Sequence, residues 1–369
     1  MKLLITGANG FIGKNLVVGL RNHNYMDIME FDTKKDLSLL EHYCKEAEFV
    51  FHLAGINRPI EESEYKNGNV DFTRVLLDTL KKQHNTCPIL FTSSIQATMD
   101  NLYGKTKKEA EEMLFSYVAE TGATVLIYRL VNVFGKWCRP NYNSVVATFC
   151  HNIANGLPIT INSPDSTLNL AYIDDVVEEF IHAIKGEANK AGEYYEIPCT
   201  HTITLKDLAD TISTFYKLHE TLGIPCMADD LTKKLYSTYL SYVPESSFQY
   251  ELQRKEDYRG SFVEFLKQDS IGQFSVIRSK PGAVRGNHWH GTKTEKFLVV
   301  SGSGIIRLRK ITSNEIIAYE VSSEKMEVVD IPVGYTHNIE NNSTTDLVVL
   351  AWVNEIFDPN NPDTYYMEV

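Results

Sequence analysis

The stretch LLITGANGFIG, residues 3–13, decides the fold of the first part of the chain. Its apolar start predicts a strand and the segment after it is amphipathic, so the glycines between them lie where a dinucleotide-binding loop requires them. Gly7 allows the tight turn, Gly10 lets the backbone approach a pyrophosphate, and Gly13 lets helix and strand pack closely. N–H groups at the helix start can receive phosphate charge. The stretch therefore predicts a nucleotide-binding strand–loop–helix unit.

The acid that follows the next predicted strand bears on the choice of cofactor. Asp32 lies roughly 20 residues after the loop, where a carboxylate can accept hydrogen bonds from the adenosine ribose. This position favours NAD, whose 2′-hydroxyl it would bind, whereas Lys34 and Lys35 could neutralise the 2′-phosphate of NADP. The residues alone leave both cofactors open.

Length and composition limit the classes of protein that remain. The 369 residues exceed what one hydrophobic core usually organises, and 43% apolar with 23% charged residues excludes a largely disordered chain. The net charge of -12 disfavours binding to nucleic acid or anionic lipid. No apolar run suits a signal peptide or a membrane span, and the six cysteines form no CxxC pair. We expect a cytoplasmic protein of two domains with reduced thiols, without membrane insertion.

Short apolar runs alternate with longer amphipathic segments up to about residue 240, which is typical of a parallel sheet covered by helices. These runs are 3–6, 27–32, 49–54, 89–92 and 125–130. After residue 260 the pattern changes to strands separated by glycine-containing turns, which indicates an all-β sandwich or barrel. A polar and charged stretch at 243–257 separates the two patterns. We therefore place the domains at 1–245 and 246–369.

A group of reactive side chains follows the glycine loop. Tyr103 and Lys107 are four residues apart on a predicted helix that ends near Gly122, so they share one face. An ammonium beside a phenol, with the nicotinamide cation or the field of the cofactor nearby, favours phenolate, so we expect the pKa of Tyr103 to be lowered from about 10. Tyr103 can then exchange a proton with a sugar oxygen while hydride moves at the attached carbon, and Ser94 can hydrogen-bond the same oxygen. An isolated YxxxK pair is more often a surface pair; the preceding glycine loop favours catalysis.

Another group lies in the C-terminal part of the chain. His288 and His290 point to one side of a strand, and Glu295 and His337 add a carboxylate and another imidazole. These ligands suit zinc, and also iron, manganese or nickel, with a position left for water or substrate. Histidine pairs on strands are often only polar surface or packed rings. The ligand types and the glycine turns around them favour a metal site in which at least three of the four coordinate.

Several segments carry a family resemblance. They are TGANGFIG at 6–13, FVFHLAG at 49–55, TSS at 92–94, YGKTK at 103–107, RLVNVFG at 129–135 and YIDDV at 172–176. They resemble the extended short-chain dehydrogenase/reductase family over about two thirds of the chain. The resemblance implies a Rossmann domain acting on nucleoside-diphosphate sugars, with a small substrate lobe at roughly 135–240. The segment between Ser94 and Tyr103 is shorter than in many sugar epimerases, which bears on how Ser94 meets the substrate.

The same resemblance assigns residues to substrate and cofactor. Asn132 is the expected substrate contact, and Ser94, Tyr103 and Lys107 are the expected catalytic residues. The expected cofactor contacts are Gly7, Asn9, Gly10, Phe11, Ile12, Gly13, Asp32, Lys34, Lys35, Leu53, Ala54, Gly55, Tyr103 and Lys107.

The C-terminal group resembles the two motifs of the cupin family. The first motif supplies His288, His290 and Glu295, and the second supplies His337. Met326 stands where the second motif usually begins with glycine, which loosens one turn without removing a ligand. The expected architecture is therefore an α/β Rossmann domain of the extended short-chain dehydrogenase/reductase type, followed by an all-β cupin, a jelly-roll barrel. Zinc is the favoured metal.

Both halves together resemble bifunctional enzymes of capsular polysaccharide synthesis that make the UDP-N-acetyl-L-fucosamine precursor. This implies a UDP-2-acetamido-2,6-dideoxy-4-hexulose whose C3 is inverted by the cupin and whose C4 ketone is reduced by the first domain. It also implies NADPH, with NAD as the alternative, and a UDP-6-deoxy-N-acetyl-L-talosamine product. We expect a homodimer, because cupins often bury a sheet face against a copy of themselves. Two alternatives stay open: an NAD-dependent UDP-sugar C4 epimerase or dehydratase whose cupin only dimerises, and a cupin that senses nucleotide sugars.

Overall fold

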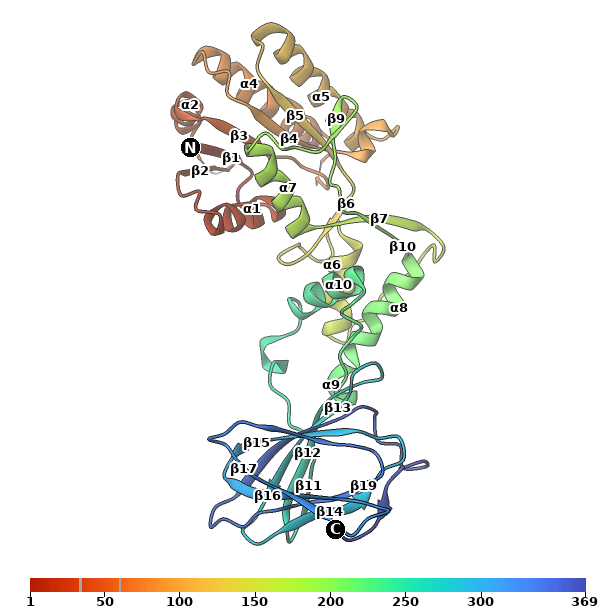
Figure 1. The fold of residues 1–369 in the computed structure, drawn as a ribbon. Helices are drawn as coiled ribbons and strands as arrows, with labels where there is room; N and C mark the ends of the chain where they lie inside the picture. The colour runs from red at the N-terminus through yellow and green to blue at the C-terminus, as the bar shows by residue number, and fades with distance from the viewer. Residues whose placement is uncertain (33–34, 60) are drawn as a thin grey trace. The chain divides into compact units, whose positions relative to one another are not determined.

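The computed structural model describes residues 1–32, 35–59 and 61–369, which form two compact units (Figure 1). Unit 1 comprises Met1–Ser213 and Asp229–Pro244, and unit 2 comprises Thr214–Ala228 and Glu245–Val369. Within the described residues, no helix has the length and apolar content needed to cross a membrane.

Unit 1 is built on a seven-stranded sheet with the order β2-β1-β3-β4-β5-β9-β8. All neighbours pair in parallel except β8, which is antiparallel to β9. The chain places β2 on one side of β1 and then crosses to β3 on the other, so the carboxyl ends of β1 and β3 form the switch point where open α/β sheets bind ligands. The strands are β1 Leu3–Thr6, β2 Ile28–Phe31, β3 Phe49–His52, β4 Ile89–Ser94, β5 Val125–Leu130, β8 Lys190–Ala191 and β9 Tyr194–Tyr195.

Helices cover both faces of this sheet because its central strands are buried on both sides (Figure 1). Leu3 and Ile5 pack with α1 and α7 on one face, whereas Leu4 packs with α2, α4 and α5 on the other. The helical segments are α1 Phe11–Asn22, α2 Leu37–Glu46, α3 Ser63–Lys66, η1 Asn67–Asp71, α4 Phe72–Lys82, η2 Ile95–Thr98, α5 Leu102–Thr121 and α7 Ile173–Ile184. The predicted Rossmann-like N-terminal domain is confirmed.

A three-stranded sheet with the order β10-β7-β6 completes unit 1, together with further helices. Tyr172 ends β7 and leads directly into α7, so the YIDDV segment joins this small sheet to the main one. The elements are β6 Asn132–Phe134, α6 Val145–Ala154, β7 Thr167–Tyr172, β10 His201–Thr204, α8 Leu205–Tyr216 and α10 Asp230–Leu240.

Unit 2 contains two antiparallel sheets, with the orders β11-β12-β13-β20-β15-β18 and β17-β16-β19-β14-β21. Phe297 and Val299 of the first sheet share one apolar core with Ile306 and Leu308 of the second, so the sheets pack face to face. The predicted sheet-rich C-terminal domain is confirmed. Its elements are α9 Leu218–Thr221, η3 Glu245–Ser247, β11 Arg254–Asp257, β12 Gly260–Gln268, β13 Gly272–Ser279, β14 Val284–Trp289, β15 Glu295–Ser301, β16 Ser303–Lys310, β17 Ile316–Ser322, β18 Val328–Ile331, β19 Tyr335–Glu340, β20 Leu347–Val353 and β21 Tyr365–Tyr366.

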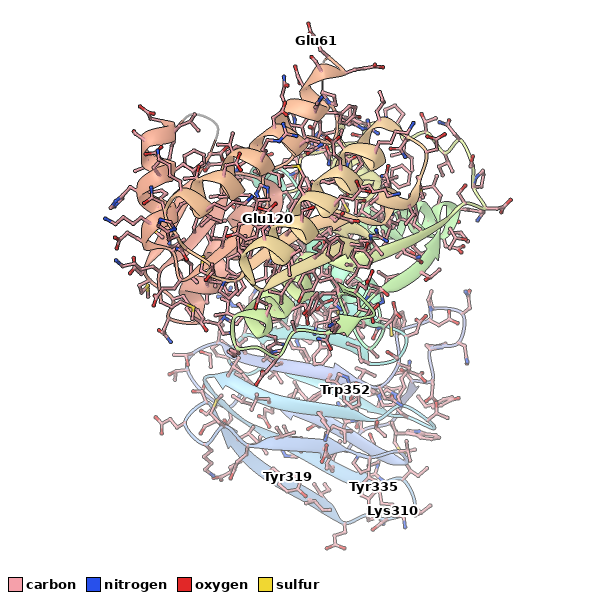
Figure 2. The ribbon with its side chains drawn as sticks, turned by 90° about the horizontal axis from the view of Figure 1, so that it is seen from above. Glu61, Glu120, Lys310, Tyr319, Tyr335 and Trp352 are labelled. Atoms are coloured by element: carbon pink, nitrogen blue, oxygen red, sulfur yellow. The ribbon has the colours of Figure 1, made fainter. Side chains whose placement is uncertain are left out.

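Aromatic side chains of unit 2 serve its packing. Trp352 on β20 and Tyr335 on β19 are labelled in Figure 2. Trp352 donates its indole N–H to the carbonyl oxygen of Ile271 at 2.6 Å, and Tyr335 packs against the apolar core. Trp289 stacks on Tyr365 with ring centroids 4.7 Å apart. These contacts indicate that the aromatic residues stabilise the packing of unit 2.

Met326 has φ 50°, a left-handed conformation that favours glycine. It is the position where the resemblance in the sequence leads us to expect glycine. The turn therefore keeps the backbone shape of a glycine turn, and the methionine carries the strain of adopting it.

Candidate functional site

The loop between β1 and α1 lies against the residues that follow β3. Gly7 has φ +72°, and a Cβ there would lie 2.8 Å from the Cα of Ala54, so no side chain fits. A Cβ on Gly13 would lie 2.3 Å from the carbonyl oxygen of Gly7, so this glycine lets α1 pack onto the loop. The N–H of Leu53 bonds the carbonyl oxygen of Thr6 at 3.1 Å. The loop and residues 53–55 thus meet at the switch point of the sheet.

Helix α1 begins at Phe11, and its N-cap Gly10 has no side chain to satisfy the first N–H groups of the helix. Asn9 donates its N–H to a carboxylate oxygen of Asp32 at 3.0 Å, so the predicted ribose-binding acid lies beside the loop. Lys35 is exposed and donates its ammonium to the carbonyl oxygen of Glu30 at 2.6 Å. Lys34, the other predicted partner of a 2′-phosphate, lies outside the described residues.

Packing at the start of α5 positions Tyr103. The side chain of Asn101 accepts the N–H of Gly104 at 2.8 Å and caps the helix. A Cβ on Gly104 would lie 2.0 Å from the carbonyl oxygen of Gln96, so the glycine lets α5 sit directly on η2. Since η2 follows β4 and begins after Ser94, this contact brings Tyr103 to the end of β4.

Lys107 is buried one turn further along α5. Its ammonium donates to the carbonyl oxygen of Thr92 at 3.0 Å, and a Cβ on Gly55 would lie 3.0 Å from its Nζ. The same ammonium lies 6.0 Å from the centroid of the Tyr103 ring. Lys107 therefore lies between the end of β4, the segment after β3 and the face of α5 that also carries Tyr103.

In the protein without its cofactor, the pKa of Tyr103 is raised, and the predicted lowering beside a bound cofactor stays a prediction. Burial raises the pKa of Tyr103 to about 12, and a hydrogen bond with Ser94 only partly opposes this rise. Burial also lowers the pKa of Lys107 to about 8. The spacing of Tyr103 and Lys107 indicated proximity, but desolvation is the largest influence on the pKa of each side chain. Ser94 and Tyr103 do meet, as the order of the segments predicts.

A cavity of about 620 Å³ opens beside Tyr103. Its lining is mostly polar and consists of Asn57, Arg58, Pro59, Glu62, Tyr65, Gln96, Asn101, Leu102, Tyr103 and Asn143. Asn132 is not part of this lining; it is exposed on β6 and donates its amide to the carbonyl oxygen of Asn169 at 3.3 Å. Sequence reasoning missed Asn57, whose Oδ1 is buried without a hydrogen-bond partner among the described residues. Such an acceptor can be satisfied by a ligand N–H or hydroxyl.

In unit 2, the four predicted ligand side chains converge although they come from three strands and a loop. One nitrogen or oxygen from each of His288, His290, Glu295 and His337 lies within 4.8 Å of the others. The Oε2 of Glu295 lies 3.0 Å from His337 Nε2 and 3.7 Å from His290 Nε2. Both contacts are close enough for ion pairs, and His290 Nε2 and Glu295 Oε2 are buried without a hydrogen-bond partner among the described residues.

The cluster combines a neutral imidazole with a carboxylate that stays ionised. Burial lowers the pKa of His288 to about 4, which leaves a neutral, metal-binding imidazole. Although burial opposes it, the neighbouring imidazoles of His290 and His337 hold the pKa of Glu295 below its usual value. Three imidazoles and one carboxylate, all buried or partly buried, fit the donor set of zinc.

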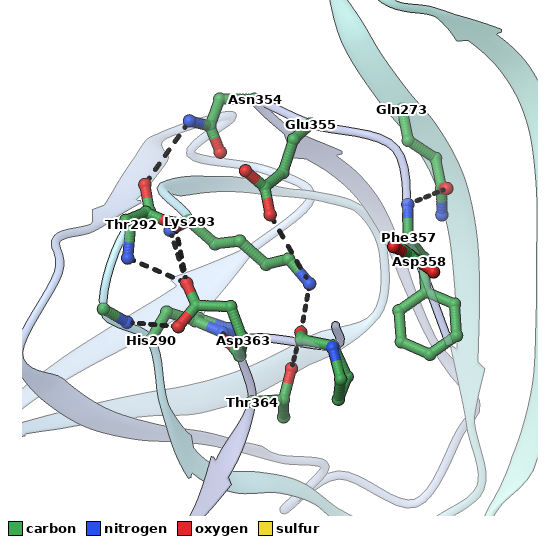
Figure 3. A network of polar contacts seen from close by, with 12 residues as sticks. Gln273, His290, Thr292, Lys293, Asn354, Glu355, Phe357, Asp358, Asp363 and Thr364 are labelled. Atoms are coloured by element: carbon green, nitrogen blue, oxygen red, sulfur yellow. Dashed lines mark hydrogen bonds and ion pairs between the residues drawn. The ribbon is translucent and has the colours of Figure 1, made fainter. Parts of the chain in front are cut away.

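The C-terminal segment orients His290, as Figure 3 shows. The carbonyl oxygen of Asp363 lies 2.6 Å from His290 Nδ1, which leaves Nε2 for the cluster. The carboxylate of Asp363 accepts the N–H groups of Gly291, Thr292 and Lys293 at 2.9, 2.8 and 3.0 Å. Asp363 has φ 37°, so the chain maintains a strained residue here. Sequence reasoning missed Asp363, because nothing in its local pattern indicates a contact with residue 290.

Comparison with known proteins shows to which family the chain belongs. Residues 3–197, more than half of the chain, match the NAD dependent epimerase/dehydratase family. The chain belongs to this family. The family points to a nicotinamide cofactor for unit 1. Residues 255–365 of this epimerase/dehydratase-family chain match the polysaccharide biosynthesis C-terminal domain.

Relatives of this family member match it over its full length. It is 43% identical over 369 residues to a UDP-2-acetamido-2,6-beta-L-arabino-hexul-4-ose reductase of Pseudomonas aeruginosa, covering 100% of this chain and 99% of that protein. The crystal structure of the capsular polysaccharide assembling protein CapF from Staphylococcus aureus is similar with a TM-score of 0.94 and 47% identity, at 100% coverage of both chains. CapF with the inhibitor 3-isopropenyl-tropolone gives a TM-score of 0.90 and 44% identity, also at 100% coverage of both chains.

A second group of metal-binding residue types in this family member lies in unit 1. Asp175, Cys199 and His201 place one potential ligand atom each within 4.8 Å of the others. The ammonium of Lys234 lies among them, 2.8 Å from Asp175 Oδ2, 3.3 Å from Cys199 Sγ and 3.4 Å from His201 Nε2. Burial opposes protonation, but hydrogen bonds to Asp175 and Asp230 raise the pKa of Lys234. This group therefore has an internal cation and ties α7, β10 and α10 together.

Proposed function

We propose that this chain is a bifunctional nucleotide-sugar enzyme of capsular polysaccharide synthesis. Unit 2 inverts C3 of a UDP-2-acetamido-2,6-dideoxy-4-hexulose, and unit 1 then reduces the C4 ketone to give a UDP-6-deoxy-N-acetyl-L-talosamine. One observation carries the proposal: the Ser94–Tyr103–Lys107 group and the cluster around Glu295 occur in one chain, in separate units. The full-length likeness to a reductase of a UDP-4-keto sugar and to CapF supports it.

For the reductase we propose NADPH, with NAD as the alternative. The loop from Gly7 to Gly13 and the start of α1 would hold the diphosphate, and Asp32 and Lys35 lie where the adenosine ribose would be read. Leu53, Ala54 and Gly55 would line the nicotinamide half. When bound, the cofactor supplies the hydride that reduces C4.

Tyr103 is the proposed proton donor to the oxygen at C4. A pKa of about 12 keeps the phenol protonated at neutral pH, so it can give a proton to the oxygen as negative charge develops there. Ser94 would orient the carbonyl, since it lies close enough to Tyr103 to influence the pKa of the phenol. The ammonium of Lys107 would bind the cofactor ribose and stabilise the phenolate that remains. We also propose Asn132 as a substrate contact, which requires the sugar nucleotide to reach β6.

For unit 2 we propose a cupin jelly-roll barrel that holds zinc through His288, His290, Glu295 and His337. A bound divalent metal would act as a Lewis acid toward the carbonyl oxygen. The C4 ketone acidifies the hydrogen on C3, and inversion requires a proton to leave one face and return to the other. We propose 1–245 as the reductase domain and 246–369 as the cupin domain, and a homodimer as the assembled form, which light scattering would test.

Deuterium exchange tests the two activities separately. The protein is incubated with a UDP-4-keto-6-deoxy-N-acetylhexosamine in deuterated water, with and without NADPH, and C3 deuteration and cofactor oxidation are followed. We expect deuteration without NADPH, and cofactor oxidation when NADPH is present. Cofactor oxidation without C3 exchange would leave only a reductase, and exchange without oxidation would leave only an epimerase. Neither reaction, with NAD retained, would favour a C4 epimerase or dehydratase.

Variants at the two centres provide matched controls. Tyr103→Phe should slow cofactor oxidation roughly 10²- to 10⁴-fold while C3 exchange continues, because only the proton donor to C4 is lost. His290→Ala should abolish exchange while the reduction of C3-inverted substrate continues. Normal C3 exchange by metal-free His290→Ala protein would contradict a catalytic metal.

A further inference from the structure

Strand β14 contains a bulge immediately before its histidines. Its pairing with β19 joins Arg285 to Ile339 and His288 to His337, and the register shifts between Gly286 and His288. Arg285 and His288 are three residues apart, so a regular strand would point them to opposite faces. The extra residue places them opposite Ile339 and His337, which share one face. Bulges next to active sites re-aim side chains in this way.

The backbone at this bulge is strained, so turning these side chains to one face costs conformational free energy. Gly286 has φ +103°, and a Cβ there would lie 2.6 Å from the carbonyl oxygen of His337. Asn287, the extra residue, has φ 58°. Two successive left-handed residues direct Arg285 into the cavity that also contains His288.

Arg285 is an incompletely paired cation in that cavity. Its side chain is only 15% exposed, and its Nη2 reaches Asp257 Oδ1 at a long 3.3 Å. Its Nε is buried without a hydrogen-bond partner among the described residues. Asp257 already accepts the Nε and Nη2 of Arg259, at 3.0 and 2.6 Å. Two guanidinium groups therefore share one carboxylate, and burial lowers the pKa of Arg285, which indicates poor compensation of its charge.

The other charges of this cavity, which measures about 530 Å³, are accounted for. Glu264 pairs with Lys267 at 2.6 Å and with Lys255 at 3.4 Å, Lys293 pairs with Glu355 at 3.7 Å, and Glu256 pairs with Arg254 at 3.1 Å. Glu295 belongs to the histidine cluster. One positive charge is thus left over at the arginine pair, inside a cavity that also reaches the histidines.

We propose that Arg285 and Arg259 form a binding site for a diphosphate in unit 2. The guanidinium group matches phosphate oxygens with two parallel N–H donors, and a buried one gains most from such a partner. Ile339 and His337 are two positions apart on β19, so Arg285 lies about 7 Å along the strands from His288. In a nucleotide sugar, the reacting ring carbons lie at a comparable distance from the diphosphate on C1. Resting on the proposed function, the ligand class is a nucleoside-diphosphate sugar whose ring lies at the histidine cluster.

Titration calorimetry on the full chain tests this site with UDP and inorganic pyrophosphate as separate probes. Wild-type protein should bind two UDP per chain, one in each unit. Arg285→Met should weaken binding at one of them roughly tenfold to a hundredfold, because a charged phosphate contact is lost. Arg285→Lys should retain part of the affinity. UDP should bind more tightly than pyrophosphate if the site serves a nucleotide sugar.

Asp257→Asn should raise the affinity for UDP, whereas Arg285→Met should lower it. A merely structural role for Arg285 would not produce this increase. Removal of the carboxylate frees both arginines, so UDP should bind this site several-fold more tightly. Arg278→Met is the matched control, because Arg278 is exposed, pairs with Asp346 at 2.5 Å and is not part of the cavity lining. Metal content and thermal melting of each variant show whether unit 2 is intact.

The outcomes separate this site from the proposed function. If UDP binding is unchanged in folded Arg285→Met and Asp257→Asn proteins, the diphosphate site is wrong even where C3 exchange occurs. If wild-type protein shows no C3 exchange but the Arg285→Met variant binds one UDP fewer, the diphosphate site stands and the epimerase activity fails. An equal loss in Arg278→Met would also overturn the assignment.

Discussion

Lys107 is 4% exposed, and burial lowers the pKa of its ammonium to about 8 from 10.5. Between these pH values the unfolded chain binds the proton and the folded chain does not, so the free energy of unfolding rises with pH. Below about pH 8 the folded chain carries the whole cost of the buried charge, up to about 3 kcal/mol. We expect Lys107→Met to stabilise the cofactor-free protein at pH 7 and to lose the rise between pH 8 and 10.5.

Urea unfolding at a series of pH values measures this effect. Lys105→Met is the control, since Lys105 lies on the same helix with its side chain 65% exposed. A Lys107→Met protein that is less stable than wild type at pH 7 and keeps the wild-type pH dependence would show that burial does not control this residue.

Asp363 acts on the histidine cluster through one residue, His290. Asp363→Ala removes the carboxylate that holds the N–H groups of Gly291, Thr292 and Lys293, so the carbonyl that orients His290 loses its support. We expect zinc affinity to fall roughly 10- to 100-fold, as for other partners of metal ligands. Competition with a chromophoric chelator measures it. Asp358→Ala, at an exposed residue of the same segment, should leave the affinity unchanged.

At the scale of elements, the contact between α5 and η2 places Tyr103. Gly104→Ala would put a Cβ 2.0 Å from the carbonyl oxygen of Gln96, so the first turn of α5 has to move. We expect cofactor oxidation to fall more than roughly tenfold, because sub-ångström placement matters for proton transfer. C3 exchange should not change, since it belongs to unit 2. Steady-state rates of both reactions provide the measurement.

The other end of the same helix offers the control. Gly122 ends α5 with φ +72°, and a Cβ there would meet no atom within 4 Å. Gly122→Ala should therefore cost about 1–2 kcal/mol of stability through backbone strain alone and leave the reductase rate unchanged. Equal losses of activity in both variants would mean that general destabilisation, and not the displacement of Tyr103, explains Gly104→Ala.

At the scale of the whole molecule, the two candidate centres lie in different compact units. Removal of metal with a chelator should abolish C3 exchange, whereas the reduction of C3-inverted substrate should continue at the wild-type rate. NADPH oxidation with each substrate measures the difference, and added zinc should restore exchange. Loss of reduction together with exchange would show that the metal supports both units.

Much of the architecture could be predicted because it depends on local patterns. The apolar run 125–130 predicts β5, which is Val125–Leu130, and Gly122 predicts the end of α5. Alternation and glycine turns likewise indicate the sheets of unit 2. The pairing of β1 with β3 and the mixed order of strands in unit 2 could not be read this way, because pairing partners are far apart in the chain.

By itself the sequence determined which chemical groups are present and which neighbours share a face: the glycine loop, Tyr103 with Lys107, and His288 with His290. Their spacing follows from the regular geometry of helices and strands. Only the tertiary structure decided what surrounds those groups. Burial raised the pKa of Tyr103, Asp363 reached His290 from the far end of the chain, and a bulge turned Arg285 toward the histidines. Desolvation and long-range contacts depend on the packing of distant segments, so no local pattern contains them.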